Sequence, residues 1–166
     1  RRLVILINLG RDSIWVSPDF IKILNNYKEM RKMELCRGVY LAGPMAGLTA
    51  QDMKSWRSYA HDKLGDSDIK VLDPTRRISY HEQILNDKGL DRNIANRIFK
   101  QDLRDIARCE LLLVDMRDLP GIKGQGTAAE VMFAHMKNKV IIMWIAPHDT
   151  LNPFMTAMAT EIHKTL

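Results

Sequence analysis

The chain has 166 residues, of which 46% are hydrophobic and 27% charged, which suits one globular domain with a hydrophobic core. Its formal net charge of +5 favours anionic ligands, but that charge is too small to indicate DNA binding by itself. No apolar run approaches the roughly 20 residues that a membrane helix needs. The two cysteines, Cys36 and Cys109, show no metal-binding spacing, so we expect a reduced, cytoplasmic setting.

Residues 1–35 are predicted to form an N-terminal extension of unknown role, followed by one domain over residues 36–166. Within the extension, the pattern predicts a short strand over 3–7, a loop over 8–18 and a helix over 20–32.

Short apolar runs alternate with amphipathic segments through the rest of the chain. Strands are predicted over 38–42, 69–72, 110–114 and 140–145, and helices over 49–65, 91–108, 127–138 and 155–164. Strands that alternate with helices indicate βαβ units, and strands that are apolar throughout indicate burial on both faces. The sequence therefore predicts an α/β fold with a mainly parallel sheet of four or five strands between two helical layers.

Helical spacing also predicts which side chains each helix buries. Thr49 and Asp52 form a variant of the capping box at the start of the first helix. The expected buried faces are Met53, Trp56, Ala60 and Leu64 in the first helix, Ala95, Phe99 and Ile106 in the second, and Ala129, Met132, Phe133 and Met136 in the third.

In parallel sheets of this kind, ligands bind outside the carboxyl ends of the strands. This rule selects the loops over residues 43–47, 73–77, 115–126 and 146–148. The first loop has a glycine at each end, which would let the backbone approach a ligand, although a plain tight turn explains it equally well. It matches neither the dinucleotide-binding glycine pattern nor a P-loop.

Asp102 continues the apolar stripe of its helix, three residues after Phe99 and four before Ile106. A carboxyl group that faces the sheet needs a partner or a raised pKa, and functional sites collect such groups. The alternative is a residue at the edge of the stripe that pairs with Arg104 or Arg108.

Glu130 follows Gly124, Gly126 and Thr127 at the start of a predicted helix. In the first helical turn, the helix dipole would favour the ionised carboxylate, which can attack an electrophilic carbon. The alternative is structural, because Thr127 and Glu130 have the spacing of a capping box.

Arg76 and Arg77 follow the second predicted strand and could hold a phosphate group, with a solvated loop pair as the alternative. The five histidines show no metal-ligand spacing, so we expect no metal ion and no cofactor.

Taken together, these elements resemble the nucleoside 2-deoxyribosyltransferase family and its nucleotide N-hydrolase relatives. The resemblance spans roughly residues 38–150 and is carried by four segments, VYLAGPM at 39–45, VLDP at 71–74, DLRDIARCELLLV at 102–114 and GTAAE at 126–130.

The resemblance implies a flavodoxin-like fold and glycosyl transfer with retention at the sugar carbon. By match to the family pattern, Glu130 would be the nucleophile, Asp102 would help the base leave, and Tyr40 would hydrogen-bond Glu130. An oxocarbenium-like transition state makes such a carboxylate chemically sensible. The substrate-binding residues expected from the match and its neighbouring loops are Gly43, Pro44, Met45, Arg76, Asp115, Gly126 and Thr127. The family's loop aspartate is not matched cleanly by Asp115 or Asp118.

The expected substrate is therefore a nucleoside or nucleotide, and the resemblance also implies a homo-oligomer. The basic balance, Arg76 with Arg77, and the end of the chain at Leu166 favour hydrolysis of a 5′-phosphorylated substrate over base exchange. A non-catalytic nucleotide sensor on the same fold is the main alternative. A nucleic-acid-binding protein finds less support, since the sequence has no helix-turn-helix pattern and no basic stripe.

Overall fold

The computed structural model describes residues 6–8, 13–15, 21–22, 24–26, 37–45, 48–65, 69–77, 92–117 and 124–164. Most of the predicted helix over 20–32 and the loop around Asp118 lie outside these residues.

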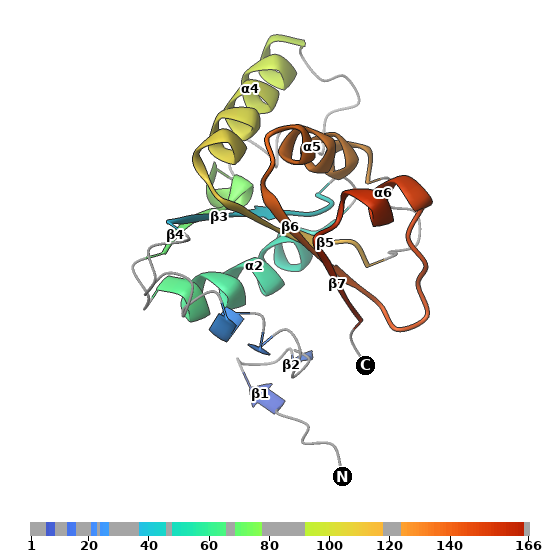
Figure 1. Ribbon diagram of the computed structural model, residues 1–166. Coiled ribbons are helices and arrows are strands. Elements are labelled where there is room, and N and C mark those ends of the chain that lie inside the picture. The colour runs from blue at the N-terminus through green and yellow to red at the C-terminus, as the bar shows by residue number, and fades with distance from the viewer. Residues whose placement is uncertain are drawn as a thin grey trace.

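The main sheet has five parallel strands in the order β4-β3-β5-β6-β7 (Figure 1). Counted along the chain from β3, this is the order 2-1-3-4-5 of flavodoxin-like folds, so the predicted fold class is confirmed. The strands are β3 (Gly38–Ala42), β4 (Lys70–Leu72), β5 (Leu111–Asp115), β6 (Val140–Ile145) and β7 (Glu161–Lys164).

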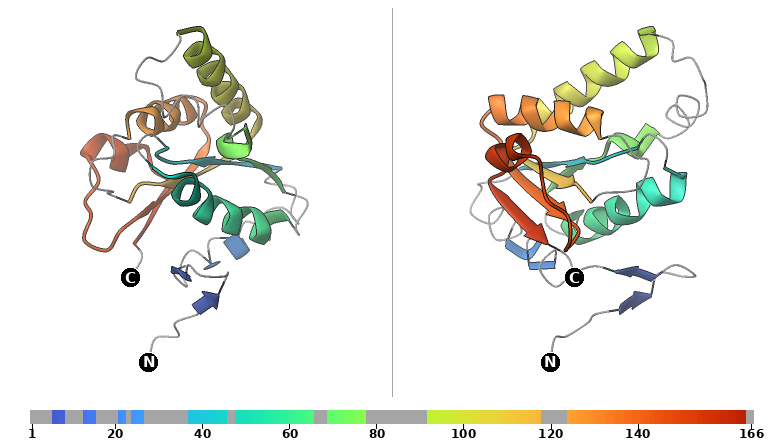
Figure 2. Two further views of the ribbon diagram at one scale, coloured as in Figure 1. Left: turned by 180° about the vertical axis from the view of Figure 1, so that it is seen from behind. Right: turned by 90° about the vertical axis from the view of Figure 1, so that its right-hand side faces the viewer.

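Helices cover both faces of this sheet and give it three layers (Figures 1 and 2). One face packs against α2 (Ala50–Gly65), and the other packs against α4 (Arg92–Arg108), α5 (Gln125–Met136) and α6 (Pro153–Met158). A 3-10 turn, η1 (Pro74–Arg77), follows β4.

Alternation along the strands divides the core into two clusters. Val39 and Leu41 of β3 pack on the α2 side, whereas Tyr40 and Ala42 pack on the α4 and α5 side. Tyr40 is fully buried, so the strand register alone directs its ring towards the two helices that carry Asp102 and Glu130.

The start of α2 forms as its sequence predicts. The Asp52 backbone N–H donates to Thr49 Oγ1 at 3.1 Å, and the Thr49 hydroxyl donates to Asp52 Oδ2 at 2.6 Å. The predicted apolar face is also confirmed, since its four side chains are at most 3% exposed.

The predicted buried face of α5 is wrong for Ala129, Met132 and Met136, which are exposed, whereas Phe133 is half-buried against the core. Met132 and Met136 are 44% and 72% exposed, and the helix instead buries Thr127, Val131 and Ala134. These smaller side chains let the α5 backbone approach the sheet closely, and this rotation brings Glu130, three residues after Thr127, to the edge of the buried face.

Three other expectations fail because tertiary contacts outweigh local pattern. Phe99 is 53% exposed because the first turns of α4 rise away from the sheet (Figure 1). Residues 161–164, predicted to be helical, form β7, whose pairing with β6 starts where the Thr160 N–H donates to the Ile141 carbonyl at 2.8 Å. Within the predicted loop over 8–18, β2 (Ser13–Trp15) pairs antiparallel with β1 (Leu6–Asn8).

The rotation of α5 can be tested by comparing Val131→Ala with Met136→Ala. We expect Val131→Ala to lower the free energy of unfolding by about 1–3 kcal/mol, because it leaves a cavity in the core. Met136→Ala should change it by less than about 0.5 kcal/mol, because that side chain is mostly in solvent. Chemical denaturation measures both, and equal losses would contradict the assigned face.

Candidate active site

A cavity of about 370 Å³ lies at the carboxyl ends of β3, β5 and β6, where the topology rule places a ligand. Three of the predicted substrate-binding residues, Pro44, Asp115 and Thr127, line it. The loop after β6 also contributes, through His148 and Asp149.

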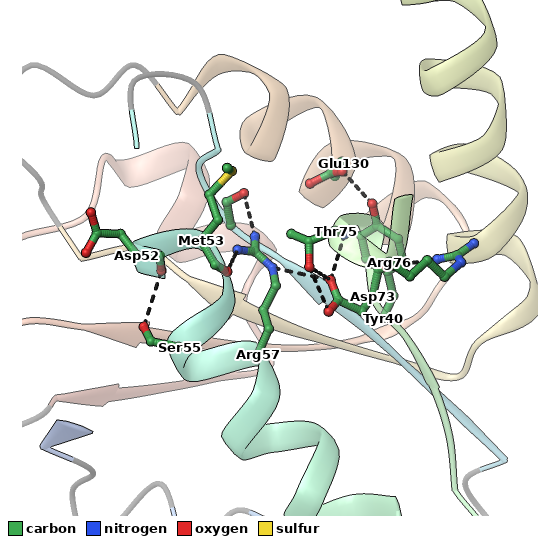
Figure 3. Close-up of polar contacts among 10 residues, drawn as sticks. Tyr40, Asp52, Met53, Ser55, Arg57, Asp73, Thr75, Arg76 and Glu130 are labelled. Atoms are coloured by element: carbon green, nitrogen blue, oxygen red, sulfur yellow. Dashed lines mark hydrogen bonds and ion pairs between the residues drawn. The ribbon is translucent and has the colours of Figure 1, made fainter. Parts of the chain in front are cut away.

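The predicted catalytic residues Tyr40, Asp102 and Glu130 are not among the residues that line this cavity, but the sheet and α5 meet in a polar contact between two of them. The Tyr40 hydroxyl donates to Glu130 Oε1 over 2.7 Å, which is the contact that the family resemblance implies (Figure 3). Burial and the nearby carboxylates raise the pKa of Tyr40 well above its usual value, so the hydroxyl keeps its proton and acts as the donor.

The structural alternative for Glu130 fails. Thr127 lies inside α5, and the N-cap position is Gly124. No side chain makes a capping hydrogen bond at this end of the helix. The helix dipole acts most strongly in the first turn of a helix. Glu130 is the sixth residue of α5 and therefore lies beyond that turn.

The expected ionised form of Glu130 is also not favoured. The pKa of its carboxyl group is raised to about 8, mainly by burial and further by the negative charge of Asp102. The hydrogen bond from Tyr40 and the positive charge of Arg57 partly oppose this rise. The free protein therefore holds a proton on Glu130 at neutral pH.

Asp102 lies on the buried side of α4, together with Asp105 and Ile106. Its negative charge raises the pKa of both Tyr40 and Glu130, so the structure brings the three predicted catalytic residues together. The tertiary structure, through three different elements, gathers side chains that are 28 to 90 residues apart in sequence.

Gly43 and Met45 belong to the first loop, and the structure explains the glycine. A Cβ at Gly43 would lie 3.1 Å from Arg57 Nη2 and 3.2 Å from Asp115 Cβ, so a side chain there would require these neighbours to shift by a few tenths of an ångström. Met45 is half-buried in the same loop. Gly126 lies exposed in the first turn of α5, and a Cβ there would meet nothing within 4 Å.

Arg76 is engaged by protein groups and is not positioned as predicted. Its guanidinium donates to the buried carboxylate of Asp105 and to the Asp73 carbonyl, at 2.7 Å in the second case, and it does not line the cavity. Of Arg77 only the backbone is described, as the last residue of η1.

Sequence reasoning missed two arginines near the site. Arg117 lines the cavity, where Nε and Nη2 bond the Asp115 carboxylate at 2.9 and 2.7 Å and the guanidinium stacks 3.9 Å from the centre of the Trp144 ring. Arg57 is fully buried on α2. The signal for Arg57 was available, because it lies four residues after Met53 on the apolar stripe of that helix.

The described residues offer neither a metal-binding cluster nor a membrane-spanning helix. Among the described residues, no three His, Cys, Asp or Glu side chains are grouped closely enough to hold a metal ion. The helices in the described part of the chain are all too short or too polar to cross a membrane.

The chain is thus a flavodoxin-like α/β protein with a cavity at the carboxyl edge of its sheet. The family model described as nucleoside 2-deoxyribosyltransferase matches residues 39–162, so the chain belongs to this family. Membership places its chemistry at the N-glycosidic bond of nucleosides or nucleotides. A search of curated proteins finds no sequence match.

Two solved structures illustrate the similarity. The 2-deoxyribosyltransferase of Bacillus psychrosaccharolyticus is 20% identical, with a TM-score of 0.58 over 76% of this chain and 85% of that one, and it supports the fold. CMP N-glycosidase BcmB of Clostridium botulinum is 15% identical, with a TM-score of 0.45 over 76% of this chain and 86% of that one.

The raised pKa of Glu130 predicts a pH-dependent stability. Between the ordinary glutamate pKa of 4.5 and about 8, the folded protein keeps a proton that the unfolded chain has lost, so the stability of the wild type falls as pH rises through this window. Glu130→Gln removes the titration. We expect the melting temperature of Glu130→Gln, relative to wild type, to increase from pH 5 to pH 8.5.

Differential scanning calorimetry at both pH values measures this difference. Glu161→Gln, which removes a mostly exposed carboxyl group on β7, controls for the loss of one negative charge. A Glu130→Gln difference that stays constant across the window would contradict the raised pKa.

Proposed function

We propose that this protein cleaves the N-glycosidic bond of a nucleoside or nucleotide through a glycosyl-enzyme intermediate on Glu130. The observation that supports the proposal is the hydrogen bond between the Tyr40 hydroxyl and Glu130, with the buried Asp102 carboxyl group beside them. Tyr40 holds the attacking carboxyl group in place, and Asp102 supplies the second carboxyl group that a retaining reaction needs.

The raised pKa of Glu130 fits an exchange of one proton between the two carboxyl groups. Like charges placed close together favour a state in which only one of them is ionised. Before the attack, the proton passes from Glu130 to Asp102, which leaves the nucleophile ionised and the acid loaded.

In the first step, a Glu130 oxygen bonds to C1′ and the bond from C1′ to the base breaks. The electron pair goes to the base nitrogen, which takes a proton from the Asp102 carboxyl group. In the second step, an acceptor bonds to C1′ and the ester bond to Glu130 breaks. Asp102 accepts the proton that the acceptor loses, which restores the state before the attack, and the return of this proton to Glu130 completes the cycle.

The acceptor is water in a hydrolase and a second base in a transferase. The Arg76 guanidinium is hydrogen-bonded to Asp105 and Asp73, so Arg76 is a weaker argument for the expected preference for a 5′-phosphate. Arg117, in the cavity, already pairs with Asp115. The assay therefore compares donors with and without a 5′-phosphate, each with and without a free acceptor base, and separates the products by chromatography.

A covalent trap tests the nucleophile directly. A donor that carries fluorine at C2′ slows both steps, and a good leaving base then lets the first step outrun the second. We expect the intact mass of the wild type to increase by one fluorinated sugar, and peptide mapping should place the label on Glu130. Glu130→Gln should take up no label and lose base release by at least about 10³-fold.

Glu161→Gln is the matched control and should label like the wild type. A label on another residue would overturn the assignment of the nucleophile. A wild-type protein that binds nucleotides but releases no base from any donor would instead be a sensor.

Asp102→Asn separates acid catalysis from a structural role. Loss of general acid assistance costs about 10²–10⁴-fold in kcat, and we expect this loss on donors whose base is a poor leaving group. Donors with an activated base should lose much less, because they need no proton. Asp62→Asn, on the exposed face of α2, is the matched control. Equal losses on both kinds of donor would assign Asp102 a structural role.

A further inference from the structure

A guanidinium group is completely buried behind the first loop of the site. Arg57 of α2 is 0% exposed, and its Nη1 donates to the Met53 carbonyl at 2.6 Å. Its Nη2 donates to the Gly43 carbonyl at 2.9 Å, and its Nε lies 3.8 Å from Asp73 Oδ1. The guanidinium also lies 4.7 Å from the centre of the Trp56 ring. Burying a charge is costly, and a surface position on α2 would avoid that cost.

These contacts connect three elements at the carboxyl edge of the sheet. Arg57 reaches from α2, Gly43 follows β3, and Asp73 follows β4, as Figure 3 shows for the arginine and the aspartate. Gly43 lies between Arg57 Nη2 and Asp115, where a Cβ would be in tight contact with both. The position of the first loop is therefore set by the arginine on one side and by the end of β5 on the other.

Arg57 and Glu130 come from helices on opposite faces of the sheet. Their charges still interact, since the charge of Arg57 lowers the pKa of Glu130. Arg57 thus contacts the first loop, one residue before the cavity-lining Pro44, and its charge also acts on the Glu130 carboxyl group.

We propose that Arg57 is a positioning residue of this active site, which fixes the first loop through the Gly43 carbonyl and supplies the positive charge that favours the ionised form of Glu130. The inference rests on the proposed role of Glu130 and adds a residue to it. Arg57 touches the loop and acts on Glu130 through space, so it is distinct from the residues that meet the substrate.

The charges around the pair determine the sign of the effect. Glu130 faces Tyr40 from β3, Asp102 from α4 and Arg57 from α2. Among these, Asp102 raises its pKa, whereas Tyr40 and Arg57 lower it. Arg57 in turn faces Asp73 and Asp115, whose negative charges partly offset its own at the site.

Lysine and methionine separate the two parts of this role. Lysine keeps the charge beside Asp73 but cannot donate in the fixed, planar geometry that reaches the Met53 and Gly43 carbonyls together. Methionine has a similar length and no charge. Asp73→Asn removes a negative charge that faces Arg57 and retains an oxygen that can accept from the Thr75 N–H, which Asp73 Oδ1 binds at 2.7 Å.

The test reads the titration of Glu130 without any substrate. The protein is labelled with glutamate carrying ¹³C at the side-chain carboxyl, and the Glu130 signal is the one that Glu130→Gln removes. We expect a wild-type midpoint near pH 8, in line with the raised pKa of about 8. Arg57→Met should move the midpoint up by about half to one pH unit, Arg57→Lys should leave it within a few tenths, and Asp73→Asn should move it down.

The kcat/KM profile gives the second readout. The falling limb, which reports the loss of the proton that Glu130 shares with Asp102 in the free enzyme, should shift with the NMR midpoint in each variant. Arg57→Lys should raise KM several-fold with an unmoved limb, because it loosens the first loop and keeps the charge. Arg92→Met, an exposed arginine at the start of α4, controls for the loss of a positive charge.

Several outcomes would overturn the inference. Unchanged midpoints in both Arg57→Met and Asp73→Asn would remove its electrostatic part, and equal shifts in Arg57→Lys and Arg57→Met would assign Arg57 to folding alone. If Arg57→Met does not fold, the other two variants still test the inference, which requires a downward shift in Asp73→Asn and an unmoved midpoint in Arg57→Lys. A wild type that releases no base would overturn the proposed function, whereas the titration would still test Arg57.

Discussion

One buried carboxyl group sets the constraint on which the rest of the site depends. Glu130 lies on a helix that packs against the sheet, and burial there disfavours its charged form more than any neighbour does. A single 2.7 Å hydrogen bond from Tyr40 ties it to the central strand β3. Because Tyr40 is itself fully buried, this bond is rigid and holds the carboxyl group at a fixed point on the edge of the sheet.

The charges around this point balance one another. Asp102 makes the proton on Glu130 harder to lose, and Arg57 makes it easier. A carboxyl group whose pKa lies near neutral pH can exchange its proton with a neighbour at small cost, which is what a reaction with one attacking and one protonated carboxyl group needs. The same arrangement would be a poor choice for stability alone, since ionising a buried carboxyl group disfavours the folded state.

The sheet divides these groups between its two faces. Tyr40, Glu130 and Asp102 meet on the side of α4 and α5, whereas Arg57 approaches from α2. Gly43 lies where the two sets come together, and its missing side chain leaves space for Arg57 and Asp115. Parallel strands that end at one edge bring these residues together, as they do in other folds of this order.

The sequence by itself determined the architecture of the main domain. Strand–helix alternation predicted the parallel sheet, the capping pair at Thr49 and Asp52 predicted the start of α2, and the family resemblance indicated Tyr40, Asp102 and Glu130 as one group. These features depend on local periodicity and on residues in a fixed order, both of which a single sequence displays. For Asp102 the stripe left two alternatives, a carboxyl group that faces the sheet or one at the edge of the stripe, and the residue is buried in the structure.

Only the tertiary structure decided how the helices are rotated, which protein groups the arginines contact, and which protonation state of Glu130 is favoured. The large apolar side chains of α5 predicted the wrong buried face, because close packing on the sheet selects Val131 and Ala134 over the methionines. Arg76 was predicted to bind phosphate, yet it pairs with an aspartate 29 residues away, whereas Arg57 was overlooked within its own apolar stripe. Burial and charge act through space, so the pKa of Glu130 depends on groups from three separate elements, and no local pattern could have predicted its rise.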